Sequence, residues 1–140
     1  MHDTSKKLRI AVRKFGPFER AMDIIWQRYC GSTGCKMEVE MVPMDLHDLH
    51  KATIQNRGLE TGEWDIAHMN TDWIYEAYTE GLLEDLSPRI ARNSPMDYPK
   101  GWSESLLQLQ QFGNHTAGLP FHDGPECLVY RKDLFTGPDE

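Results

Sequence analysis

The chain has 140 residues and a formal net charge of −7, with 39% hydrophobic and 10% aromatic residues. This share of apolar and aromatic residues excludes an intrinsically disordered chain, and the negative charge argues against nucleic acid as a partner, because phosphate binding needs clustered Lys and Arg. The sequence holds no apolar run of the roughly 18 residues that a membrane-spanning helix needs, and its length favours a single domain.

The first 86 residues alternate between short apolar runs, typical of strands, and longer amphipathic stretches, typical of helices. We expect strands at 8–12, 36–44 and 64–69 and helices at 17–30, 45–56 and 71–80. Asp45 is expected to cap the second helix, because Asp48 follows three residues later. The alternating order predicts an α/β fold, a three-layer sandwich lobe with a mainly parallel sheet between covering helices.

The first helix is expected to begin at Pro17 and to end at Gly31, because Pro suits the first turn of a helix and Gly suits its end. Its apolar side chains recur at helical spacing on one face, which should pack on the sheet. They are Phe18, Met22, Ile25 and Tyr29.

The composition changes after Leu86, and the remaining elements are expected to be short. We expect a helical stretch from Ser87, a Pro-rich loop over 93–101, a helix over 103–110 and a tight turn over 112–115 between two short strands. A last strand is expected at 127–130. The sequence shows no internal repeat and no linker that would divide the chain into two domains.

The three cysteines do not form a recognisable metal-binding pattern. Cys30 and Cys35 flank Gly-Ser-Thr-Gly, and no second cysteine pair or flanking histidine completes a zinc site. Two loop thiols and a small disulfide are both compatible with this spacing. Cys127 lies in an apolar run, where a buried, unreactive thiol is the usual state.

Candidate binding residues follow from a general property of parallel sheets, in which ligands bind beyond the carboxyl ends of the strands. Three segments meet this condition, namely 13–18, 70–73 and 121–124, and they offer aromatic faces together with carboxylates. Such side chains suit recognition rather than reaction. An alternative assigns Trp73 to helix packing and Asp72 to the charge that favours a helix start. The residues that we expect to contact a solute are Phe15, Asp72, Trp73, His122 and Asp123.

The histidines raise the alternative of a metal protein or a His-dependent enzyme built around His68, His115 and His122. His122 next to Asp123 has the composition of an acid–base pair. However, the sequence has no G-x-S-x-G elbow, phosphate-binding loop or G-x-G-x-x-G motif. His47 and His50, three residues apart, are more typical of a solvated helix face than of a metal site. We therefore expect no enzyme, no metal and no cofactor.

Several motifs together resemble extracellular solute-binding protein family 1, the sugar-type receptors of ABC importers. They are the Gly-Glu-Trp-Asp-Ile run at 62–66, Thr-Asp-Trp at 71–73, Gly-Leu-Leu-Glu-Asp-Leu at 81–86, Gly-Leu-Pro at 118–120 and Leu-Val-Tyr-Arg-Lys-Asp-Leu-Phe at 128–135. The last of these is the most specific. Trp64 stands where the family often has Pro, and the segment 13–17 matches no particular sugar class.

The resemblance implies the type II periplasmic-binding-protein fold, in which two α/β lobes are joined by hinge strands and trap a solute between them. Residues 1–127 would then form a partial N-terminal lobe, and 128–140 the first hinge strand and the start of the crossing to a second lobe. An incomplete lobe is expected to self-associate through its unpartnered apolar surface or to be marginally stable.

The resemblance also implies a function without a chemical step. The chain would capture a carbohydrate, close over it and deliver it to an ABC permease in the membrane, acting in the periplasm or outside the cell. No signal peptide is recognised in this chain. A ligand-sensing domain of the same fold is the main alternative.

Overall fold

The first element of the chain is the middle strand of a small parallel sheet. In the computed structural model, which describes residues 7–124, β1 (Leu8–Arg13) pairs with β2 (Val39–Met44) on one edge and with β3 (Ile66–Ala67) on the other. A strand between two partners loses most of its contact with water, which explains the apolar composition of β1. The residues of β1 that are almost inaccessible are Ile10, Ala11 and Val12.

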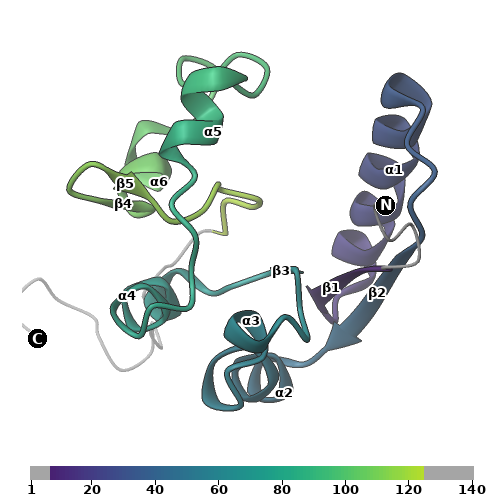
Figure 1. Ribbon diagram of the computed structural model, residues 1–140, viewed down its shortest axis with the longest axis horizontal. Coiled ribbons are helices and arrows are strands. Elements are labelled where there is room, and N and C mark those ends of the chain that lie inside the picture. Colours follow the sequence, from purple (N-terminus) through teal and green to yellow (C-terminus); the bar gives the residue numbers. More distant parts are fainter. Residues whose placement is uncertain (1–6, 125–140) are drawn as a thin grey trace, which may run out of the picture.

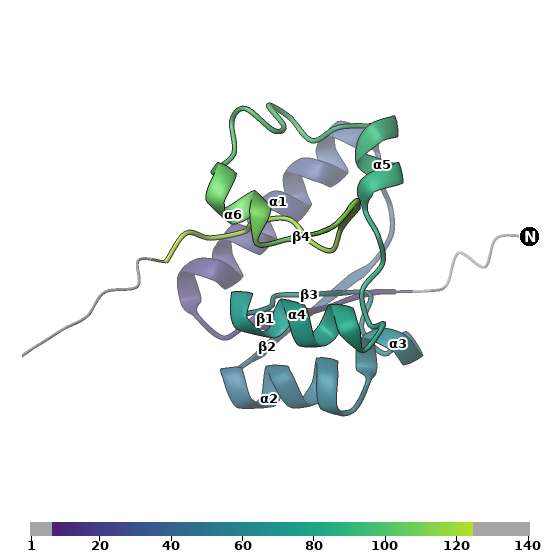
Figure 2. The same cartoon turned by 90° about the vertical axis from the view of Figure 1, so that its left-hand side faces the viewer.

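Helices follow each strand and lie on both faces of the sheet (Figures 1 and 2). One face is covered by α1 (Gly16–Thr33), and the other by α2 (Leu46–His50), its π-helical continuation η1 (Lys51–Gln55) and the short α3 (Gly58–Thr61). The strand β3 is followed by α4 (Thr71–Thr79). This order confirms the predicted α/β fold with a parallel sheet.

The start of α2 is capped as the sequence predicts. The Asp45 side chain accepts a hydrogen bond of 2.9 Å from the backbone N–H of Asp48. This bond satisfies one of the N–H groups that have no partner inside the helix. The negative charge of the carboxylate also interacts favourably with the positive end of the helix dipole.

The predicted end of α1 at Gly31 is wrong, because the helix continues to Thr33. Gly34 takes the left-handed conformation, with φ 71° and ψ 16°, and its N–H bonds to the Cys30 carbonyl at 2.9 Å. Glycine reaches this conformation without a steric penalty, so the chain turns at the glycine that adopts it. The Thr33 hydroxyl also donates to the Tyr29 carbonyl at 2.7 Å, within the last turn.

Two strands are shorter than predicted. Strand pairing on the β2 side begins only at Val39, and β3 spans two residues, which pair with Ile10 and Ala11. Trp64 lies before β3 and is buried, with the Arg9 guanidinium 4.4 Å from its ring centroid. The apolar run at 64–69 therefore contributes first to the core and only then to the sheet.

The core lies between the sheet and α2, η1, α3 and α4. It consists of two clusters of buried side chains, joined by the half-buried Leu59 and Trp73, which pack against both. One cluster is formed by Ala11, Leu49 and Trp64, and the other by Ile54, Ala77 and Leu82. Gly58 lies in close contact with Trp64: a Cβ atom there would come within 2.6 Å of Cδ1 of that ring.

The second half of the described chain contains α5 (Ser87–Arg92), α6 (Glu104–Gln108) and an antiparallel hairpin of β4 (Gln111–Phe112) and β5 (His115–Thr116). In Figure 1 these elements form a group on the opposite side from α1. The hairpin confirms the predicted turn, in which Gly113 has a φ of 60°.

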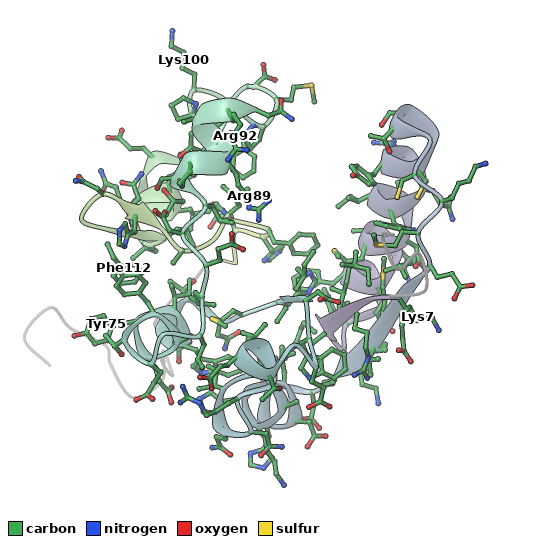
Figure 3. The ribbon with its side chains drawn as sticks, viewed as in Figure 1. Lys7, Tyr75, Arg89, Arg92, Lys100 and Phe112 are labelled. Carbon is green, nitrogen blue, oxygen red and sulfur yellow. The ribbon has the colours of Figure 1, made fainter. Side chains whose placement is uncertain are left out.

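The hairpin packs on α4 through aromatic rings. Phe112 stacks on Tyr78 with ring centroids 4.2 Å apart and an interplanar angle of 8°, and its ring lies 6.2 Å from that of Tyr75. Figure 3 shows Phe112 of the hairpin directly above Tyr75 of α4. These contacts link the second half of the chain to the sheet-bearing half.

Among residues 7–124, no helix is both long and apolar enough to cross a membrane. The predicted last strand at 127–130 and the predicted hinge crossing at 128–140 lie outside the described residues.

Candidate functional site

The carboxyl ends of β1 and β3 lie side by side and form the base of the candidate site. β1 ends at Arg13 and leads into the start of α1, while β3 ends at Ala67 and leads through His68 into α4. The backbone N–H of Arg13 donates to Nδ1 of His68 at 3.2 Å, and the His68 N–H donates to the Ala11 carbonyl at 2.9 Å. These bonds fix the His68 ring at the end of the sheet.

Aromatic side chains from three distant segments meet at this end of the sheet. Phe18, in the first turn of α1, is at the centre, and we call this group the Phe18 cluster. Its ring centroid lies 5.1 Å from Phe15, 5.9 Å from His68, 5.3 Å from Phe121 and 4.9 Å from His122. The His68 and Phe121 rings lie 4.3 Å apart. The cluster is defined by Phe15, Phe18, His68, Phe121 and His122.

The Phe18 cluster presents apolar ring faces to solvent. Phe15 is 50% exposed and Phe121 is 40% exposed, although rings of this size usually contribute to a core. His122 is exposed as well. An exposed group of aromatic side chains beyond the ends of parallel strands is typical of a ligand-binding surface.

The hydrogen bond to Nδ1 determines the tautomer of His68. Since Nδ1 accepts a hydrogen bond from the Arg13 N–H, the ring proton of neutral His68 sits on Nε2. Burial lowers the pKa of His68 below its ordinary value of 6.5, which favours this neutral form. His68 is therefore a hydrogen-bond donor at the end of the sheet.

Two donors at the strand ends lack a protein partner within residues 7–124. They are Nε2 of His68 and Nη1 of Arg13, both of which are buried atoms. A buried donor without a partner costs about 1–3 kcal/mol, so such groups usually have a role. A solute with acceptor oxygens would supply the partners that the described chain does not provide.

The structure brings together two of the five predicted contact residues. Phe15 and His122 both belong to the Phe18 cluster, and Asp123 follows His122 as an exposed side chain. Asp72 is exposed in the first turn of α4. No described hydrogen bond joins His122 to Asp123, so the two do not form the acid–base pair that their sequence suggests.

Among the described residues, no ring contact joins Trp73 to the Phe18 cluster. Its ring packs against both core clusters and meets the edge of the His50 ring, with centroids 4.9 Å apart. This is the helix-packing position considered as the alternative for Trp73. A role for Trp73 and Asp72 in solute contact remains a prediction.

Three residues that the structure places at the strand ends, Phe18, Arg13 and His68, are not among the five predicted contact residues. Helical spacing assigned Phe18 to the packing face of α1, and the first turn of that face is also the part that reaches the strand ends. Arg13 is the last residue of β1, and His68 is the first after β3. Their positions relative to the strand ends were the available signal.

The described histidines do not assemble into a metal site. His50 pairs with Glu76 at 3.0 Å, and His115 accepts or donates a 2.8 Å bond with the Tyr78 hydroxyl and lies 4.0 Å from Asp85. His115 is thus part of the hairpin contact with α4 rather than of the Phe18 cluster. Within residues 7–124, no group of three or more His, Cys, Asp or Glu side chains is placed to hold a metal ion.

The chain is similar to a known protein family. The family described as bacterial extracellular solute-binding protein matches residues 27–139, which is most of the chain and includes α4, the hairpin and Phe121 to Asp123. This match confirms the resemblance found in the sequence motifs. No curated protein matches the chain.

Proposed function

The chain belongs to the bacterial extracellular solute-binding proteins, and from this we propose that it captures a carbohydrate for an ABC importer. Membership of the family implies a small-molecule ligand, a location in the periplasm or outside the cell, and a role in solute binding and transport. The sugar and the permease are the finer part of the proposal.

The combination of the Phe18 cluster with the two unpartnered donors at the strand ends is the observation that carries this proposal. A sugar ring has an apolar face made of C–H groups, which packs on aromatic rings, and hydroxyl oxygens that accept hydrogen bonds. Phe121 and Phe15 offer the ring faces, and His68 Nε2 and Arg13 Nη1 offer the donors. Binding sites of this mixed composition orient a ligand by a few polar contacts.

The proposed action is capture without a bond being made or broken. We place the solute at the Phe18 cluster, with Asp72 and Asp123 as carboxylates that accept from sugar hydroxyls. In this proposal residues 1–127 form one lobe, 128–140 begin the crossing to a second lobe, and closure of the lobes presents the loaded protein to the permease.

The proposal is tested by titrating the full-length natural protein with a panel of monosaccharides and disaccharides, using calorimetry. At least one sugar should bind, and Phe121→Ala should weaken its binding by about tenfold, equivalent to about 1.4 kcal/mol. The loss is expected because the ring face would no longer contact the sugar.

Tyr75→Ala is the matched control for this titration. Tyr75 is an aromatic residue of α4 that is 68% exposed and contacts the hairpin rather than the Phe18 cluster. It should leave the affinity unchanged. If Phe121→Ala and Tyr75→Ala both retained full affinity, the sugar would bind elsewhere and the assignment of the site would be wrong.

A further inference from the structure

The C-terminal end of α1 brings two cysteines into facing positions of a helix-capping motif. Gly34, left-handed, donates its N–H to the Cys30 carbonyl, which is the single bond that defines the αL type of helix end. In the notation for helix ends, Gly34 is C′, Cys30 is C3 and Cys35 is C″. A contact between the residues at C″ and C3 frequently accompanies a helix end with a left-handed glycine. The cap therefore turns the chain at Gly34, with Cys30 and Cys35 on either side of the turn.

The burial pattern around this turn agrees with such a contact. Cys30 and Cys35 are both half-buried. The four residues between them are exposed, and so are the flanking residues Tyr29 and Lys36. Burial is the main cause that raises the pKa of the Cys30 thiol, and the charge and hydrogen bonding of the neighbouring Cys35 thiol raise it further. Each thiol thus lies in the immediate surroundings of the other.

We propose that Cys30 and Cys35 form an intramolecular disulfide when the protein resides outside the cytoplasm. The family to which the chain belongs acts in the compartments in which disulfides persist. The proposal depends on the location of the protein and is independent of which solute it binds.

The oxidation proceeds by thiol–disulfide exchange with a disulfide oxidant, either an oxidoreductase or oxidised glutathione. The thiolate of one cysteine attacks the oxidant and forms a mixed disulfide, which releases one thiolate of the oxidant. The thiolate of the second cysteine then attacks the sulfur of the first cysteine. This step forms the bond between Cys30 and Cys35 and expels the second thiolate of the oxidant. The protein loses two protons and two electrons, and the oxidant becomes two thiols.

The proposed bond would close a short loop around the turn that ends α1. It would hold Gly34 in its capping conformation and prevent the last turn of α1 from unravelling. This end of the helix needs support, because none of the residues of α1 is buried. Metal binding by the same thiols is not favoured, since within residues 7–124 no third ligand group accompanies them.

Mass spectrometry of a tryptic digest tests the bond directly. The full-length protein is exported, purified without reductant and digested after blocking of free thiols with iodoacetamide. Cleavage after Arg28 and Lys36 places both cysteines in one peptide, residues 29–36. We expect the mass of this peptide to be about 2 Da lower than that of its dithiol form. The peptide should take up two alkyl groups only after reduction. Two alkyl groups before reduction, or a cross-link from either cysteine to Cys127, would overturn the proposal.

Thermal unfolding tests the effect of the bond on stability. Reduction should lower the Tm of the oxidised protein by about 5 °C. The Cys35→Ser variant should unfold at the temperature of the reduced protein and should not respond to reductant. Cys127→Ser is the matched control and should keep the full response to reductant. A wild-type Tm that is the same with and without reductant would contradict the stabilising role of the bond.

Discussion

At the scale of single residues, His68 couples the candidate site to pH. Its Nδ1 accepts from Arg13 N–H, and protonation of that nitrogen would break the bond. Burial lowers the pKa of His68 in the folded protein, so below about pH 6.5 the unfolded chain takes up a proton that the folded protein resists. The stability is therefore complete above that pH and decreases as the pH falls.

We expect the Tm of the wild type to fall between pH 7.5 and pH 5.5 more steeply than that of His68→Gln, which cannot be protonated. The measurement is differential scanning calorimetry of both proteins across this range. His47→Gln, which replaces an exposed histidine of α2, serves as control and should follow the wild type. Parallel Tm profiles for wild type and His68→Gln would show that His68 makes no contribution.

The residue scale also shows which part of the site could be read from the sequence. Phe15 and His122, which the structure places in the Phe18 cluster, are predicted from their loop positions, because ligands bind beyond the carboxyl ends of parallel strands. Phe18 was assigned to packing, since a residue on an apolar helix face carries the same spacing whether it meets the sheet or the site. The hydrogen bond between the Arg13 N–H and His68 joins residues that are 55 positions apart in the sequence, so only the folded chain reveals it.

At the scale of elements, Asp85 joins the hairpin to the start of α5. Its Oδ1 accepts from Ser87 N–H at 2.9 Å and from Thr116 N–H at 3.0 Å, and the Ser87 hydroxyl donates to the Asn114 carbonyl at 3.0 Å. Hydrogen bonds lower the pKa of Asp85. The largest effect comes from the backbone N–H of Ser87, followed by the Ser87 side chain and then by the backbone N–H of Thr116. This carboxylate should remain ionised well into the acid range.

Replacement of Asp85 by Ala should loosen the hairpin, because Thr116 N–H loses one of its two acceptors. We expect its amide hydrogen to exchange at least about tenfold faster, equivalent to about 1.4 kcal/mol less protection. Hydrogen exchange followed by NMR measures this rate. Glu84→Ala removes a neighbouring exposed carboxylate that pairs with Arg89 and should leave the Thr116 rate unchanged. Unaltered exchange in Asp85→Ala would refute the anchoring role.

The type of each element followed from local signals, whereas the ends did not. The cap at Asp45 and the hairpin turn at Gly113 depend on side chains and conformations that act within a few residues. The end of α1 required a choice between Gly31 and Gly34, and both have the right side chain. The length of β3 depended on burial of Trp64, which is set by packing against distant elements.

At the scale of the whole molecule, the order of elements and the motifs together predicted both the parallel α/β fold and the family. The fold class follows because each amphipathic helix must cover a sheet that its two flanking strands help to build. The family followed from motif identity, which periodicity alone does not supply. The identity of the solute depends on the detailed shape of the site, and sequence patterns carry little of that information.

The face of α1 predicted to pack on the sheet does so only along part of its length. Phe18 and Met22 are half-buried, whereas Ile25 and Tyr29 are each 51% exposed, and Ile24 next to them is 49% exposed. In Figures 1 and 2 the C-terminal part of α1 extends beyond the strands. Exposed aliphatic and aromatic side chains that lie together favour association with another apolar surface.

We therefore expect the 140-residue chain to self-associate at concentrations of about 100 µM, as measured by sedimentation velocity. Ile25→Lys should shift the distribution toward monomer without lowering the Tm, because a charge on this face opposes burial and the side chain is not part of the core. Met96→Lys is the control, since Met96 is 86% exposed in a loop far along the chain and should leave association unchanged. A wild-type chain that stays monomeric at this concentration, or an Ile25→Lys variant that associates equally well, would show that the exposed face of α1 does not drive association.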